Sequence, residues 1–240
     1  MKFKVLTLFS DMIEAFCNHS IIRRGIESNH LSVDIIDYRD YSNNKHHKVD
    51  DTPYGGGQGM VLTVQPIDDA LKANKTSESK VILVCPTGKP FKQEDANLLA
   101  KEKELIFVCG HYEGYDERIR SYVDYEYSIG DYVLTSGELA AMVMIDAIGR
   151  LVDGVIEKAS HEEDSFQNGL LEHPQYTKPR VYDNMEVPEV LLNGHHKYID
   201  EWRLEQSVIK TMKNRPDLLV NKDLDPKIIE VINKIKKQGL

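Results

Sequence analysis

Hydrophobic and polar positions over the first 150 residues of the chain follow two different periods. Short apolar runs rich in β-branched residues predict strands, and longer stretches with apolar positions three or four residues apart predict helices. The predicted strands are Lys2–Phe9, Leu31–Arg39, Lys80–Cys85 and Leu105–Cys109, and the predicted helices are Gln65–Ala73, Lys92–Lys103, Glu117–Val123 and Glu138–Val152. This alternation is typical of an α/β fold in which helices flank a mainly parallel sheet.

The predicted helix Glu138–Val152 is apolar almost all round, with an unbroken apolar run from Leu139 to Ile145. A helix with one apolar stripe suits one buried face, whereas a helix that is apolar all round suits burial between two surfaces. We therefore expect a subunit interface along this helix.

The character of the sequence changes after Gly154. Residues 154–170 are polar and acidic and have no sustained periodicity, which predicts a flexible linker. Beyond them the pattern predicts helices over His195–Met212 and Pro226–Lys237, and Pro216 lies in the break between the two helices. The predicted organisation is a main domain over residues 1–153, the linker 154–170 and a small helical domain over residues 171–240.

Composition is that of an ordinary globular protein, with 41% hydrophobic and 29% charged residues among 240. No apolar stretch approaches the roughly 18 residues that a membrane span needs. The N-terminal run resembles a strand more than an export signal, and the three cysteines Cys17, Cys85 and Cys109 lack metal-ligand spacing. We expect a soluble, cytoplasmic protein in a reducing compartment, with no contact with a membrane.

The formal net charge of −9 argues against a general nucleic-acid coat protein, because such binding depends on clustered Lys and Arg. The charge is unevenly distributed along the chain. Residues 171–240 hold 12 Lys and Arg against 11 Asp and Glu, which leaves 18 against 28 for residues 1–170. Local basic surface in residues 171–240 could still bind a structured RNA, so the net charge alone neither supports nor excludes RNA binding.

A glycine cluster, Tyr54-Gly55-Gly56-Gly57-Gln58-Gly59-Met60, is the first candidate for chemistry. It lacks the Gly-Lys-Ser/Thr ending of a phosphate-binding loop, and its spacing does not fit the dinucleotide fingerprint. Taken alone, a flexible loop without a ligand and a loop that approaches a substrate are equally good interpretations.

Three further segments with glycine follow strands in the sequence, at residues 85–88, 109–114 and 128–138. In open α/β sheets the carboxyl ends of the strands form the ligand crevice. Three such segments close together could surround one small molecule with backbone donors and acceptors. For any one of them alone, ordinary turn chemistry is the better interpretation.

Five runs carry a resemblance to a known family. They are Tyr54–Met60, Val108–Arg118, Ser128–Leu134, Asp164–Phe166 and Glu186–Pro188. In that order they resemble the bacterial tRNA (guanine-N1)-methyltransferases of the SPOUT class of knotted methyltransferases, over nearly the whole chain. The resemblance implies a deep trefoil knot, which no periodicity predicts because knots are nearly absent from proteins. It also implies a homodimer with the active site at the subunit interface, and a C-terminal helical domain that binds tRNA.

The activity that the resemblance implies is transfer of a methyl group from S-adenosyl-L-methionine to N1 of guanine 37, the base just 3′ of the anticodon. The products are the methylated tRNA, which resists frameshifting, and S-adenosyl-L-homocysteine. The family also implies a requirement for Mg²⁺, although the sequence itself predicts no protein-bound metal. His46-His47 beside Asp50-Asp51 is better interpreted as a polar loop.

The resemblance assigns site residues in three groups. The cofactor contacts are Pro86, Thr87, Gly88, Gly110, Tyr112, Glu113, Ile129, Gly130, Tyr132, Leu134 and Gly137. The substrate contacts are Tyr54, Gly55, Gly56, Gly57 and Gly59. The catalytic residues are Asp164 and Arg150.

The two catalytic assignments have a chemical reason and a simpler alternative. N1 of neutral guanine carries a proton, which the Asp164 carboxylate would accept, and the Arg150 guanidinium would stabilise charge developing on O6. Without the resemblance, Asp164 beside Glu163 is an ordinary solvated acid, and Arg150 could pair with Asp146 one helical turn earlier.

The chain departs from the usual family pattern at three places. His111 stands where Arg is common, Gln58 where Pro is common, and Ser136 where Gly is common. Ser136 could narrow the cofactor segment, because a glycine there would allow closer backbone approach.

Other functions remain as alternatives. A non-enzymatic RNA-binding protein of this fold would be expected to lack Asp164, Arg150 or the cofactor segments, and all are present. A dehydrogenase or a kinase would need a dinucleotide fingerprint or a phosphate loop. The nearest alternative is a knotted methyltransferase that acts on another RNA position.

Overall fold

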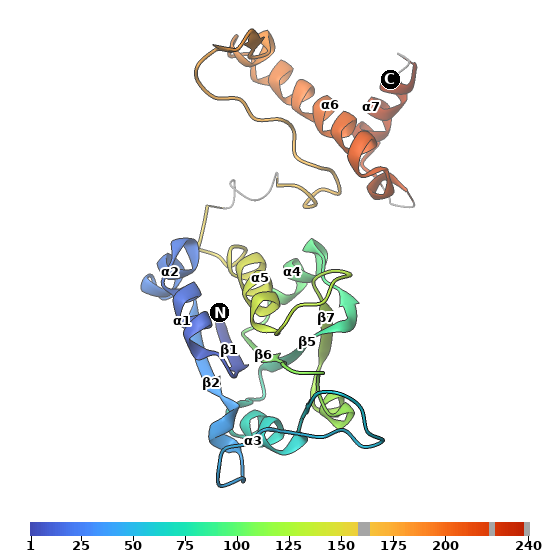
Figure 1. The fold of residues 1–240 in the computed structure, drawn as a ribbon. Helices are drawn as coiled ribbons and strands as arrows, with labels where there is room; N and C mark the ends of the chain where they lie inside the picture. Colours follow the sequence, from blue (N-terminus) through green and yellow to red (C-terminus); the bar gives the residue numbers. More distant parts are fainter. Residues whose placement is uncertain (158–163, 221–223, 238–240) are drawn as a thin grey trace. The chain divides into compact units, whose positions relative to one another are not determined.

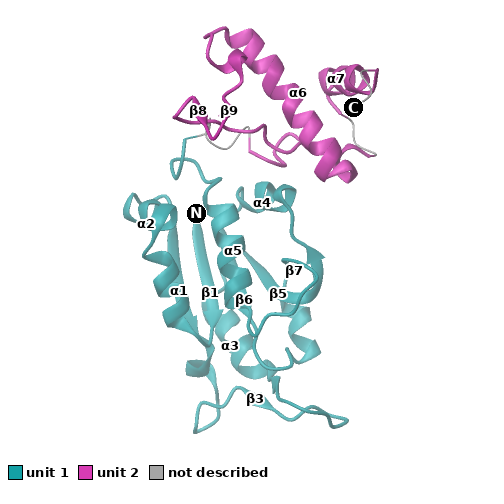
Figure 2. Cartoon of the chain, turned by 45° about the horizontal axis from the view of Figure 1, so that its top comes forward, with its two compact units in different colours: residues 1–158 teal, residues 159–240 magenta. Residues whose placement is uncertain are grey.

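The computed structural model describes residues 1–157, 164–220 and 224–237. The chain divides into two compact units, residues 1–158 (unit 1) and residues 159–240 (unit 2), coloured separately in Figure 2. Each unit is described by itself below.

Unit 1 is built on a five-stranded sheet of order β2-β1-β6-β5-β7 (Figure 1). All neighbouring strands in this sheet are parallel. The strands are β1 (Lys2–Thr7), β2 (Ser32–Asp37), β5 (Ser79–Pro90), β6 (Glu104–Cys109) and β7 (Tyr125–Ser128). The predicted α/β fold with a mainly parallel sheet is thereby confirmed.

Helices cover both faces of the sheet because successive strand residues point to opposite sides. On β6, Leu105 and Phe107 belong to one hydrophobic cluster, and Ile106 and Val108 belong to the other. The helices of unit 1 are α1 (Ser10–Cys17), α2 (Ser20–Glu27), α3 (Val64–Asn74), α4 (Gln93–Leu99) and α5 (Glu138–Gly149). The first cluster includes residues of α1, α2, α4 and α5, and the second includes residues of α3.

The structure differs from the predicted elements at several places in unit 1. Strand β7 was not among the predicted strands, and α4 ends at Leu99, short of the predicted end at Lys103. Helices α1 and α2 were not predicted, because eight residues are too few for a 3.6-residue period to stand out. The predicted helix Glu117–Val123 is a 3₁₀-helix, η2 (Glu117–Tyr122). Strand β5 runs beyond the predicted end at Cys85 as far as Pro90.

The smaller elements of unit 1 connect these parts. They are the 3₁₀-helix η1 (Tyr38–Tyr41) and the antiparallel pair β3 (Asp50–Asp51) and β4 (Val61–Leu62). The pair β3 and β4 flanks the glycine cluster, which is therefore the loop of a short hairpin.

Unit 2 contains a small core of Leu170, Val208, Ile228 and Ile235. Its elements are β8 (Val181–Tyr182), β9 (Met185–Glu186), η4 (Glu189–Leu191), α6 (His196–Asn214), η5 (Pro216–Leu219) and α7 (Pro226–Lys237). Both predicted helices of this region are confirmed. Among the described residues, no helix combines the length and the apolar character that crossing a membrane requires.

The expected linker, residues 154–170, includes residues 158–163, which lie outside the described part of the chain. At the end of the expected linker Leu170 is buried in the core of unit 2. The backbone N–H of the next residue, Leu171, donates to Oγ1 of Thr211 on α6 at 2.8 Å. The chain is therefore packed against α6 from Leu170 onward.

Candidate active site

A cavity of about 460 Å³ lies at the carboxyl ends of β5, β6 and β7. Residues 84–87, 110–115 and 127–130, together with residues 132–137, form most of its wall. These are the three glycine-containing segments that the sequence places after strands. The volume is in the range of small-molecule sites, which lie at strand carboxyl ends in open α/β sheets.

All the residues that the resemblance assigns to the cofactor line this cavity, with the exception of Gly88. A Cβ atom on Gly88 would lie 2.6 Å from the backbone nitrogen of Tyr127. Gly88 therefore allows β5 to approach β7 closely, and it is not among the residues that line the cavity.

Backbone contacts hold the second and third segments together. The N–H of Gly137 donates to the carbonyl of Gly110 at 2.8 Å. A Cβ atom on Gly137 would lie 2.9 Å from the Gly110 nitrogen, and one on Gly110 would lie 2.4 Å from the ring of Tyr115. The wall is thus packed too closely for side chains at these two positions, so its shape is set by the backbone.

Two tyrosines strengthen the same wall. The Tyr115 hydroxyl lies 2.9 Å from the carbonyl of Val108 on β6 and 3.3 Å from that of Val84 on β5. Burial raises the pKa of the Tyr115 hydroxyl well above its usual range, so it stays protonated and can donate. Tyr112 has a φ of 59°, which is uncommon for a non-glycine residue and is typical of a functional constraint.

The first segment differs from the other two because it interrupts a strand ladder. Tyr127 on β7 pairs with Val84 and also with Lys89 of β5, so residues 85–88 bulge out of the ladder. Pro86 and Thr87 in this bulge are exposed. Side-chain contacts therefore have to provide the support that ladder hydrogen bonds give elsewhere.

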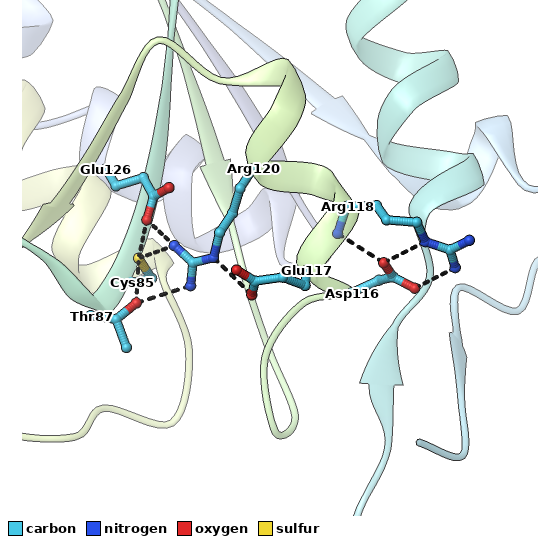
Figure 3. Close-up of polar contacts among 7 residues, drawn as sticks. All are labelled: Cys85, Thr87, Asp116, Glu117, Arg118, Arg120 and Glu126. Atoms are coloured by element: carbon cyan, nitrogen blue, oxygen red, sulfur yellow. Dashed lines mark hydrogen bonds and ion pairs between the residues drawn. The ribbon is translucent and has the colours of Figure 1, made fainter. Parts of the chain in front are cut away.

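Arg120 of η2 is a charged residue of the cavity wall that the sequence did not single out. Its guanidinium contacts Glu117, Glu126 and Thr87 and, at 4.0 Å, Sγ of Cys85, as Figure 3 shows. The hydrogen bond with Glu117 raises the pKa of the Arg120 guanidinium further above its usual range, so the group stays cationic. No periodicity marks Arg120, because a short 3₁₀-helix has no apolar repeat that would reveal which face is inward.

The glycine cluster does not line the cavity but is fastened to its wall. Gly55, Gly57 and Gly59 have φ values of 87°, 137° and 84°, which favour glycine over other residues. A Cβ atom on Gly59 would lie 2.4 Å from Cγ of Glu113, and the Glu113 N–H donates to the carbonyl of Met60 at 3.0 Å. The cluster therefore ends beside the second cofactor segment, whereas Tyr54 at its start is fully exposed.

Arg150 is at the opposite end of α5 from the cavity. Gly137 is the N-cap of this helix and Arg150 its C-cap, so about 20 Å of helix separates them. A Cβ atom on Gly149, next to Arg150, would lie 3.8 Å from the ring of Phe3 at the start of β1. Arg150 thus lies at the amino-end edge of the sheet, and the structure does not bring it to the cavity of its own chain.

Asp164 belongs to unit 2, just after residues that the structure does not describe. Its carbonyl accepts a hydrogen bond from the Gln167 N–H at 3.2 Å, in a turn of the chain. The structure therefore defines the local surroundings of Asp164 within unit 2, whereas the residues of the cavity wall all belong to unit 1.

The polar groups of the cavity fit a ligand with its own donors and acceptors. Nδ1 of His111, which stands where the family has Arg, is buried and has no hydrogen-bond partner in the structure. A buried imidazole nitrogen without a partner is costly, so a bound polar group at this wall would satisfy it. Among the described residues, no group of three or more His, Cys, Asp or Glu could hold a metal ion.

Comparison with known proteins agrees with the motifs. The family model described as tRNA (Guanine-1)-methyltransferase TrmD matches residues 1–221. A tRNA (guanine-N(1)-)-methyltransferase of Staphylococcus epidermidis is 54% identical over 99% of this chain and 98% of its own length. Proteins of the same description from Desulforamulus reducens and Clostridium botulinum are 55% and 54% identical, over 93% and 98% of this chain and 91% and 99% of their own lengths.

Proposed function

The chain belongs to the tRNA (guanine-1)-methyltransferase family, and from this premise we propose that the cavity at the ends of β5, β6 and β7 holds S-adenosylmethionine. The protein is an enzyme that transfers a methyl group from this donor to N1 of guanine 37 in tRNA. The observation that supports the location is that three separate glycine-containing segments line one cavity. A tRNA substrate also favours the expected cytoplasmic location.

The fit of the donor rests on the packing of the wall. Gly110 and Gly137 leave no room for side chains where the second and third segments meet, so backbone groups face the cavity there. The unpartnered Nδ1 of His111 offers a further polar contact. The close contact between these segments also supports our proposal that they form the trefoil knot of the family.

The reaction needs a base because N1 of neutral guanine carries a proton and is a poor nucleophile. When bound, S-adenosylmethionine supplies an electrophilic methyl group. We assign the base to Asp164, whose carboxylate would accept the N1 proton. We assign to Arg150 the stabilisation of negative charge on O6, because a guanidinium donates to an oxyanion in fixed directions.

The distance along α5 requires a second chain for this chemistry. Arg150 lies about 20 Å from Gly137, well beyond the reach of its side chain, so a guanine at the cavity cannot contact the Arg150 of the same chain. We propose that a homodimer brings Arg150 of one copy to the cavity of the other.

Helix α5 also offers the surface for such a dimer. Leu139 and Val143 lie one helical turn apart on α5 and are 44% and 50% exposed. Large apolar side chains in one exposed stripe are typical of a protein interface. Leu139 and Val143 lie on α5 between its cavity end and Arg150. A dimer formed along them would therefore involve both the cavity and Arg150.

Unit 2 is the proposed tRNA-binding part of the chain. Lys197 of α6 and Lys227, Lys234 and Lys237 of α7 line one groove in this unit. Such lysines can contact phosphates, although Asp200, Glu201, Glu205 and Glu230 lie in the same groove and Lys234 pairs with Glu205 at 3.0 Å. The Mg²⁺ that the family implies would then be held mainly by oxygens of the RNA or of the bound donor.

Labelled S-adenosylmethionine tests the proposed substrate. The enzyme should transfer label to a tRNA that has guanine at position 37 and should not label the same tRNA with another base there. Equal labelling of both tRNAs would contradict the position and would favour a methyltransferase that acts elsewhere on RNA.

A further inference from the structure

Arg120 has no assigned role, although it lies in the wall of the cavity. We propose that Arg120 is a positioning residue that fixes Thr87 and the bulge of residues 85–88 against β7, and thereby increases the affinity for S-adenosylmethionine. This role rests on the proposed function, because it concerns the wall of the proposed donor site.

The bulge needs an anchor because of the way β5 pairs with its neighbour. Residues 85–88 have no pairing partner on β7, since Val84 and Lys89 both pair with Tyr127. Two of the bulged residues, Pro86 and Thr87, line the cavity and are exposed. Without an anchor, binding a ligand would have to order these residues, which lowers affinity.

Arg120 connects the bulge to the following strand. Its Nη2 donates to Oγ1 of Thr87 at 3.0 Å, and its Nη1 donates to the carboxylate of Glu126 on β7. Glu126 pairs in the ladder with Leu83, two residues before the bulge. One planar guanidinium therefore joins the tip of the bulge to the regular part of the sheet, as Figure 3 shows.

The contacts of Arg120 favour positioning over direct binding of the donor. Its third nitrogen, Nε, donates to Glu117 at 2.9 Å, so each guanidinium nitrogen already has a protein acceptor. Two carboxylates, those of Glu117 and Glu126, also offset its charge. A guanidinium held in this way keeps little capacity to attract the carboxylate of a ligand.

The two ion pairs of Arg120 differ in exposure. The side chains of Arg120 and Glu126 are each 29% exposed, whereas that of Glu117 is 84% exposed. Solvent weakens the exposed pair most. The contacts with Glu126 and Thr87 are therefore the ones that hold the bulge.

Arg118 supplies a matched comparison on the same 3₁₀-helix. It forms a bidentate pair with Asp116, at 2.9 and 2.6 Å, and its side chain is 74% exposed. Unlike Arg120, it is not among the residues of the cavity wall, and Figure 3 shows the two pairs side by side. Losing Arg118 removes one arginine and one ion pair but leaves the bulge untouched.

Calorimetry on the full-length protein tests the role with two ligands. S-adenosylhomocysteine keeps the amino-acid carboxylate, and 5′-methylthioadenosine lacks it. For Arg120→Met we expect the Kd of both ligands to rise by a similar factor, roughly 10-fold or more, because the bulge is loosened for either ligand. For Arg118→Met we expect both Kd values to stay as in the wild type.

Two results would overturn the positioning role. Weaker binding of S-adenosylhomocysteine alone would make Arg120 a direct contact of the carboxylate, and unchanged binding of both ligands would leave it without a role at the site. If the wild-type protein bound neither ligand, the proposed donor site itself would fail, and that result differs from both.

A double-mutant cycle separates positioning from general destabilisation. Thr87→Val should weaken binding of both ligands as Arg120→Met does. The double variant should bind them only a little more weakly than either single variant. Thr87→Ser keeps the hydroxyl and should restore most of the affinity. Fully additive losses of ligand affinity, together with no recovery of affinity in Thr87→Ser, would contradict a role of Arg120 that works through Thr87.

Discussion

The two ends of α5 have different parts in the proposed reaction. The first end, at Gly137, packs against Gly110 in the wall of the proposed donor cavity, whereas the second end carries Arg150 at the other edge of the sheet. One rigid helix therefore separates donor binding from the chemistry on guanine within a single chain. Changes at the first end should therefore affect binding of the donor, and changes at the second end or in unit 2 should affect turnover.

The largest effect is expected for the base. Asp164→Ala should lower single-turnover methyl transfer by roughly 10²–10⁴-fold, about 3–5 kcal/mol, because the variant lacks the carboxylate that we assign as acceptor of the N1 proton. The Kd for S-adenosylmethionine, measured by calorimetry, should stay unchanged, since the cavity wall consists of residues of unit 1 and Asp164 belongs to unit 2. Loss of donor binding in this variant would contradict the separation of donor binding from the chemistry on guanine.

A smaller effect, on binding of the donor rather than on turnover, is expected for Gly137→Ala. The added Cβ would lie 2.9 Å from the Gly110 nitrogen and 3.0 Å from Cα of Cys109, so backbone would have to move. We expect the Kd for S-adenosylhomocysteine to rise roughly 10-fold or more.

Gly149→Ala, at the other end of the same helix, is the matched control. Its Cβ would meet a methyl group of Ile22 at 3.1 Å, which a flexible side chain can relieve, and the Kd should stay unchanged. If Gly149→Ala weakened binding as much as Gly137→Ala, the two ends of α5 would not be functionally distinct.

The mildest change concerns the exposed stripe of α5. Leu139→Asp should shift the protein from dimer toward monomer in sedimentation experiments at micromolar concentration, because a charge would be buried in the proposed interface. Ile229→Asp, at a similarly exposed residue of α7, should leave the dimer intact. Identical sedimentation of both variants and the wild type would place the interface elsewhere.

The sequence predicts the scaffold better than the site. The apolar runs that became β1, β2, β5 and β6 and the longer helices were evident because the two periods persist over enough residues. The bulge in β5 was not evident, since Pro86, Thr87 and Gly88 are equally compatible with a loop after a strand. Only the three-dimensional register, in which Tyr127 pairs on both sides of the bulge, reveals it.

The candidate site was predicted from the resemblance more than from residue chemistry. Segments with glycine pointed to strand ends, but nothing in their spacing requires a knot or selects Asp164 and Arg150 among many acids and arginines. Arg120 was missed altogether, because its role depends on contacts with Thr87 and Glu126 that no sequence pattern records.

A mixed dimer tests the proposed sharing of the site most directly. One copy would carry Gly137→Ala and the other Arg150→Met, and methyl transfer would be measured at a donor concentration near the wild-type Kd, at which the Gly137→Ala homodimer would be about one-tenth occupied or less. The mixed dimer should be active at one of its two sites, where an intact cavity meets an intact Arg150 of the partner copy, while both homodimers stay nearly inactive. A mixed dimer as inactive as the homodimers would contradict a site built from two chains.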